Sequence, residues 1–129
     1  MYQVKALPVP RQAGSERKRA LVELLAKIEA GEVIQSTDAV DIWPTDARSM
    51  ALPWLDACKA SQGSLDAAKA LHEAVLPNFL WKINCSNATV YPFNAPDTGS
   101  GFYGMSDNPA RAWLCAIIQA LIANEDTKP

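Results

Sequence analysis

The apolar residues of this chain change their spacing at Pro77, and this change restricts the folds that the chain can adopt. Before Pro77, the segment SLDAAKALHEAVLP carries apolar residues at helical intervals, with Ser64 as its predicted N-cap. After it, apolar residues alternate over 79–85, which is the pattern of a strand with one buried face. We therefore predict a helix that is followed almost at once by a strand.

Two further strands and a final helix are expected after this first strand. β-branched and aromatic residues at 88–93 and 102–105 predict strands that complete an antiparallel meander. Asp107 or Asn108 then supplies a cap, and Pro109 occupies the first turn of a helix whose apolar residues cover most of its circumference. We expect that helix to be largely buried.

The N-terminal half is expected to add helices to this core. The segment from Ser15 to Gly31 predicts a helix, with the glycine placed as a left-handed C-cap. Residues 1–13 contain prolines and little periodicity, which predicts an extended or flexible arm. Pro53 either kinks a helix or begins one, and we favour a helix over Pro53–Ala60 because proline suits a first helical turn.

The segment EVIQSTDAVDIWPTD, at 32–46, predicts a turn or a short strand, because Pro44 disfavours helical geometry at Trp43. Taken together, the elements predict an α+β fold with a three-stranded antiparallel sheet flanked by helices. Its core has the order α-β-β-β-α, with extra N-terminal helices. We predict a single domain over 14–124 and a flexible tail over 125–129.

Composition indicates an ordinary globular chain without a strong field for one class of partner. Of 129 residues, 49% are hydrophobic and 20% are charged, and the formal net charge of -2 favours neither nucleic acid nor an anionic membrane. The apolar run at 110–123 is interrupted by Arg111 and Gln119 and is too short to span a bilayer. No export signal is recognisable at the start, so we expect a cytoplasmic protein.

Candidate catalytic and metal-binding residues are few. Three cysteines, Cys58, Cys85 and Cys115, occur in apolar settings that predict reduced, buried thiols. With His72 they match the composition of a Cys3His zinc site, but they lack the paired spacing of such sites. We predict no catalytic, cofactor-binding or metal-binding residue, and we interpret His72 as a packed residue at the edge of the core. An enzyme that uses Cys85 or Cys115 with His72 is the least favoured alternative.

Exposed aromatic residues are the remaining candidates for a functional site. Tyr91 and Phe93 point to the face of the sheet opposite Val90, and Tyr103 joins them from the third strand. These aromatic residues either complete a second core layer or, together with Arg111, form a contact surface. We favour the core layer because helices usually cover each apolar face of a small sheet.

The segments GSLDAAKALHEAVLPNFLWKI, at 63–83, and FYGMSDNPARAWLCAIIQAL, at 102–121, resemble the phage ABA-sandwich domain family. In this chain, SDNPA at 106–110 stands where that family has a Thr-Pro-Ala type of cap. The resemblance covers about 63–123 and implies a phage or prophage origin and an αβα layering. It brings no catalytic residue with it.

The leading functional hypothesis is therefore a small phage accessory protein that acts by binding, as an inhibitor of a host defence system. Its partner would be a host or phage protein, or a small signalling molecule, in the bacterial cytoplasm. Self-association is compatible with the apolar last helix or with a strand edge. The alternative is a nucleic-acid-binding module or a HicB-like antitoxin, since the order of elements is similar to both. Where double-stranded RNA-binding domains cluster lysines, however, this chain has only Arg111.

Overall fold

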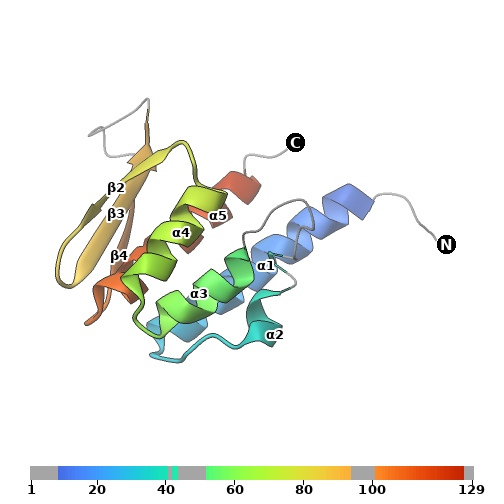
Figure 1. Ribbon diagram of the computed structural model, residues 1–129. Helices are drawn as coiled ribbons and strands as arrows, with labels where there is room; N and C mark the ends of the chain where they lie inside the picture. The colour runs from blue at the N-terminus through green and yellow to red at the C-terminus, as the bar shows by residue number, and fades with distance from the viewer. Residues whose placement is uncertain (1–8, 41, 44–51, 94–100, 127–129) are drawn as a thin grey trace.

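The computed structural model describes the backbone of residues 9–40, 42–43, 52–93 and 101–126. Within these ranges, it describes the side chains of residues 16 to 125. Its elements are, in chain order, α1 (Val9–Glu29), α2 (Ser36–Ala39), α3 (Pro53–Ser61), α4 (Leu65–Val75), β2 (Phe79–Ile83), β3 (Asn87–Pro92), β4 (Phe102–Met105) and α5 (Pro109–Asp126). These helices and the three-stranded antiparallel sheet they flank confirm the predicted α+β class (Figure 1).

The strands form an antiparallel meander in the order β2-β3-β4, as predicted. Trp81 lies opposite Val90, and Val90 lies opposite Phe102. Because successive strand residues face opposite sides of a sheet, this register defines an inner face with Phe79, Trp81, Ile83, Ala88, Val90, Phe102 and Gly104. The register places the residues of β2 on the faces that the alternation predicts, but Trp81 is 36% exposed on the face that was expected to be buried. Cys85 lies beyond the strand and is exposed, where burial was also expected.

The described helices lie on the inner face of the sheet. α5 packs directly against β3 and β4, and α1, α3 and α4 pack around the rest of α5. Figure 1 shows the sheet on one side of this group of helices. The resemblance implied helices over both faces, but within the described ranges the helices flank the sheet on one face only. The prediction that Tyr91, Phe93 and Tyr103 complete a second core layer on the opposite, outer face is therefore wrong for the described part of the chain.

α5 is the centre of the molecule. Its residues 112–118 are buried without interruption. A helix that is covered on one face exposes residues at every turn, so continuous burial requires neighbours on all sides. This confirms the prediction of a largely buried last helix. The helix continues to Asp126, so the predicted tail is wrong over 125–126, and 127–129 lie outside the described residues.

Gly104 allows β4 to approach α5 closely. A Cβ atom at this position would lie 2.1 Å from the carbonyl oxygen of Ala112, far inside van der Waals contact. A glycine inside a strand often marks such a close backbone approach. The only side chain that fits between this strand and this helix is therefore a hydrogen atom.

The predicted switch from helix to strand at Pro77 is confirmed. Ser64 Oγ accepts a hydrogen bond from the backbone nitrogen of Ala67 at 3.1 Å, which caps α4. After α4 and a short turn, β2 brings Trp81 against His72 and Trp113, with ring centroids 4.9 and 5.2 Å away. This ring cluster joins α4, β2 and α5.

The N-terminal helices differ from expectation at their starts. α1 begins at Val9, so the predicted arm is wrong over 9–13, and residues 1–8 lie outside the described part of the chain. Pro10 falls in the first turn of α1, where a missing N–H costs nothing. Gly31 has a φ of 89°, which confirms the predicted left-handed C-cap region. Pro53 begins α3, as favoured.

The segment predicted as a turn or short strand contains a single helical turn, α2. Asp38 Oδ2 accepts a hydrogen bond from the backbone nitrogen of Gln35 at 2.9 Å, which stabilises the start of that turn. Ile42 and Trp43 follow it and are buried. The apolar residues buried in the described part of the chain form one cluster, to which α1 contributes Leu21, Leu24 and Ile28. None of the helices described combines the length and apolar character needed to cross a membrane.

Candidate contact surface

The outer face of the sheet carries apolar side chains that no described helix covers. Phe93 is 68% exposed, Met105 is 69% exposed, and Tyr103 is 49% exposed. Leu80 is 37% exposed, and Tyr91 is half-buried between its neighbours. We name this set the outer patch, and its members are Leu80, Tyr91, Phe93, Tyr103 and Met105.

The strand register brings the outer patch together. Leu80 on β2 lies opposite Tyr91 on β3, and Tyr103 on β4 lies opposite Thr89. Phe93 directly follows β3 and donates its backbone N–H to the carbonyl of Asn78, which continues the ladder by one pair. Residues on one face of paired strands lie within side-chain reach of each other. The patch is therefore one surface built from all three strands.

The composition of this face is unusual for a solvated sheet. An antiparallel sheet with one face in water normally alternates between apolar inner and polar outer residues. Here the outer positions of the three strands are polar at Lys82, Asn87 and Thr89, and apolar or aromatic at Leu80, Tyr91, Tyr103 and Met105. Contiguous exposed apolar surface that includes aromatic and methionine side chains is typical of sites of protein interaction.

Arg111 is not part of this surface. Its guanidinium donates hydrogen bonds to the carbonyl oxygens of Ser61, Ile28 and Glu32, the last two at 2.7 and 3.0 Å. These carbonyls lie at the ends of α3 and α1, so the side chain ties three helices together on the helical side of the molecule. The structure therefore unites the three predicted aromatic residues and separates Arg111 from them.

Leu80 and Met105 belong to the outer patch but were not predicted as contact residues. The period-2 pattern carries the signal for both, because Leu80 alternates with Trp81 and Met105 is two residues from Tyr103. The pattern shows which face a residue lies on, but it does not show that no described helix covers this face.

His72 is 1% exposed, and both of its ring nitrogens are engaged. Trp113 Nε1 is only a donor, so Nδ1 of His72 accepts its hydrogen bond at 3.1 Å. Nε2 therefore carries the proton and donates to the carbonyl of Phe79 at 2.9 Å. Burial lowers the pKa of His72 from its ordinary value. The predicted packed histidine is confirmed, and neither nitrogen is available to activate a nucleophile.

The thiols give little support to cysteine chemistry. Cys58 and Cys115 are buried, as predicted, and burial raises the pKa of Cys115 to about 11. A thiol with this pKa is protonated near neutral pH and is a weak nucleophile. Within the described ranges, no three His, Cys, Asp or Glu side chains gather in a way that could hold a metal ion.

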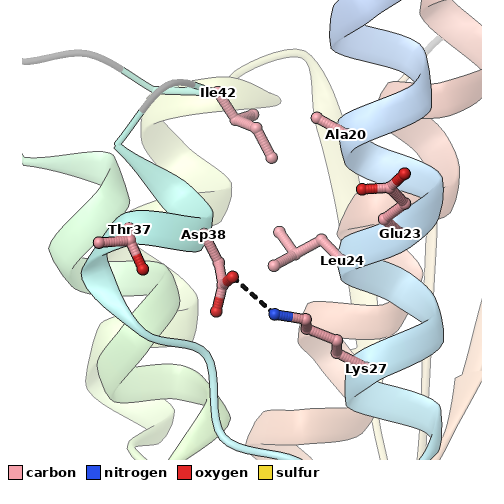
Figure 2. Close-up of a pocket in the computed structure, with 7 residues that line it drawn as sticks. All are labelled: Ala20, Glu23, Leu24, Lys27, Thr37, Asp38 and Ile42. Carbon is pink, nitrogen blue, oxygen red and sulfur yellow. Dashed lines mark hydrogen bonds and ion pairs between the residues drawn. The ribbon is translucent and has the colours of Figure 1, made fainter.

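A small pocket of about 210 Å³ lies between α1 and α2 (Figure 2). Lys27 and Asp38 form an ion pair across it at 2.7 Å. Their hydrogen bond raises the pKa of Lys27 and lowers the pKa of Asp38. The remaining lining residues are Ala20, Glu23, Leu24, Thr37 and Ile42. The pocket is smaller than the roughly 300 to 1,000 Å³ of most ligand sites, and two of its three charged lining residues, Lys27 and Asp38, are paired with each other.

Comparisons with known proteins place this chain in no group: no family model, no curated protein and no solved structure matches it.

Proposed function

We propose that this protein acts by binding another protein through the outer patch of its sheet. The observation that carries the proposal is the exposure of Phe93, Tyr103 and Met105 on one continuous face. Aromatic and methionine side chains are enriched at the centres of protein interfaces, where their burial contributes most of the affinity. The face is stiff, because a hydrogen-bonded sheet holds it and α5 supports it from below.

The resemblance of residues 63–123 to the phage ABA-sandwich domain family extends this proposal to a biological role. We infer that the chain is a phage accessory protein that inhibits a host defence system by contacting one of its proteins. A protein partner is favoured over a small signalling molecule because the outer patch is broad, whereas the pocket at Lys27 and Asp38 is small and its only cation is paired with Asp38. No feature of the described residues favours the nucleic-acid alternative: Arg111 is engaged by backbone carbonyls, and the strands contain one cation.

The test compares variants of the outer patch against a purified partner. A tagged copy of the protein is used to isolate partners from the bacterial cytoplasm, and each partner is then purified and titrated calorimetrically. Phe93→Ser and Met105→Ser remove apolar contacts at exposed positions, and we expect each to weaken binding by tenfold or more. Val22→Ser is the matched control, because Val22 is 47% exposed on α1, outside the outer patch.

The control variant is expected to bind as the unchanged protein does, and all three variants are expected to keep the unfolding temperature within a few degrees. The proposal is wrong if Phe93→Ser and Met105→Ser bind the partner with unchanged affinity. It is also wrong if Val22→Ser weakens binding as much as they do.

A further inference from the structure

The edge of the sheet at β4 presents backbone groups whose direction follows from the ladder. The nitrogen of Ser106 donates to the carbonyl of Ser86 at 3.0 Å, and these two residues continue the register of β3 and β4 by one pair. In an antiparallel ladder, hydrogen-bonded pairs alternate with pairs whose N–H and C=O groups point away from the partner strand. Tyr103 and Met105 therefore direct their backbone groups away from β3, to the outer edge of β4.

Gln119 on α5 agrees with this direction and covers one of the four edge groups. Its Nε2 donates a hydrogen bond to the carbonyl of Tyr103 at 2.7 Å. Within the described ranges, no partner is found for the N–H of Tyr103 or for the N–H and C=O of Met105. The two residues are also 49% and 69% exposed. β4 is therefore an open sheet edge.

β4 has few of the features that keep the edges of sheets apart. Proteins usually protect edge strands with charges, proline, bulges or covering elements. The sequence of β4 is FYGM, which contains neither a charged residue nor a proline, and its register with β3 runs without a bulge. The strand is short, but nothing in its sequence opposes pairing with an identical strand.

We propose that β4 pairs with β4 of a second copy of this chain, in an antiparallel register centred on Gly104, so that the two sheets become one. In this register, Tyr103 lies opposite Met105 of the second copy, and the N–H and C=O groups of both residues are satisfied. The carbonyl of Tyr103 can accept this bond beside the one from Gln119, because a carbonyl oxygen has two lone pairs. The pairing goes beyond the proposed function and needs no other protein.

The side chains of β4 select a second copy as the occupant of this edge. In a two-fold contact, each surface must be compatible with itself. Tyr103 would lie beside Met105 of the second copy on the outer face, and sulfur–aromatic contacts are favourable. On the inner face, Gly104 would face Gly104 of the second copy, where no side chain can collide. A register centred on Tyr103 or Met105 would instead pair one of them with a residue outside β4.

The first test uses the unchanged protein alone. Small interfaces are weak, so we expect a shift from monomer toward dimer between about 10 µM and about 1 mM in sedimentation experiments. NMR of the nitrogen-15-labelled protein should show that the amides of Tyr103 and Met105 become protected from solvent exchange over the same range. The amide of Trp81 is the internal control and should not change, because its N–H points to the opposite edge of the sheet.

Paired charged variants test the register. Tyr103→Lys combined with Met105→Lys places lysines opposite each other in the dimer, and Tyr103→Glu combined with Met105→Glu does the same with carboxylates. Like charges that face each other across strands destabilise the pair, so each double variant alone should dimerise at least about tenfold more weakly. An equimolar mixture of the two should associate, because every lysine then faces a glutamate. Association of the mixture also shows that both variants are folded.

The inference is overturned if the unchanged protein remains monomeric at about 1 mM, if the protection appears at Trp81 instead, or if the two charged variants do not associate with each other. Phe93→Ser alters the outer patch outside β4 and should leave dimerisation unchanged. Its loss of dimerisation would indicate that the outer faces pack on each other, which also contradicts pairing at β4. None of these experiments contains the natural partner, so their failure leaves the proposed function standing. Conversely, unchanged partner binding by Phe93→Ser and Met105→Ser would overturn the proposed function and leave the strand pairing intact.

Discussion

His72 shows how a single residue can tie the layers of this protein together. Its ring accepts a hydrogen bond from Trp113 on α5 and donates one to the backbone of Phe79 at the start of β2. Only the neutral ring can do both, because a protonated imidazole has no acceptor nitrogen. The charged neighbour whose field acts on the ring is Glu73, on the same helix.

The stability of the protein should fall as the pH decreases through the range where His72 titrates. Burial lowers the pKa of His72 from its ordinary value of 6.5, so the unfolded chain takes up a proton at a pH where the folded protein does not. The free energy of unfolding contributed by this group is therefore complete above that ordinary value. It is lost as the pH falls toward the folded-state pKa, at no more than about 1.4 kcal/mol per pH unit.

Urea unfolding at about pH 7.5 and about pH 5.5 measures this dependence, with His72→Gln as the comparison. The unchanged protein should lose more stability between the two pH values than the variant loses. Equal losses in the two proteins would show that His72 is not the titrating group.

Gly104 sets the distance between β4 and α5, and its replacement should be costly. In Gly104→Ala the new methyl group would collide with the carbonyl of Ala112, so the strand must move off the helix. We expect the free energy of unfolding to fall by at least about 2 kcal/mol. Met105→Ala, on the exposed side of the same strand, should change it by less than about 1 kcal/mol. A Gly104→Ala variant as stable as Met105→Ala would contradict the close packing.

At the scale of elements, Arg111 links the C-terminal ends of two helices to the start of a third. Carbonyl groups at helix ends have no partner within their own helix, and a positive charge near them is favourable. Arg111 donates to the carbonyls of Ile28 in the last turn of α1, Glu32 just beyond α1 and Ser61 at the end of α3. One arginine thus fixes the relative positions of α1, α3 and α5.

Replacement of Arg111 by methionine should keep the apolar stem and remove these hydrogen bonds. We expect a loss of about 2 to 3 kcal/mol in the free energy of unfolding, since hydrogen bonds from charged groups are the stronger ones. Lys69→Met is the control, because Lys69 belongs to an exposed i,i+4 pair with Glu73 and should matter little. Chemical denaturation of both variants measures the difference. Similar small losses in both would contradict the linking role.

The elements of this fold could be predicted where one local signal dominated. The change of period at Pro77, the Ser64 cap and the all-round apolar character of 109–123 led to the correct helices and strands. The start of α1 was missed because prolines near the N-terminus indicated an arm, although Pro10 is compatible with a first helical turn. α2 was missed because one turn of helix has no period to detect.

The candidate site was predictable only in part, for a different physical reason. Period-2 alternation correctly placed Tyr91, Phe93 and Tyr103 on one face. Whether a helix covers that face depends on how the helices assemble, and the sequence of the strands does not contain this information. The partners of Arg111 come from segments far away along the chain, so its structural role was equally hidden.

At the scale of the whole molecule, the helices form the core, whereas the sheet leaves one face exposed to solvent. α5 is packed between the other helices and the inner face of the sheet, and its residues 112–118 are buried. The outer face of the sheet remains for contact. A rigid sheet supported from one side can present a contact surface without rearrangement, which lowers the entropic cost of binding.

Hydroxyl-radical footprinting read by mass spectrometry tests the central claim most directly, because it reports the solvent access of individual side chains. In the free protein, Met105, Phe93 and Tyr103 should be labelled rapidly and the buried Trp113 slowly. When the natural partner is bound, labelling of the three outer-patch residues should fall severalfold, while that of Val22 on α1 stays the same. Undiminished labelling of Phe93 and Met105 in the complex, or slow labelling of both in the free protein, would contradict the account.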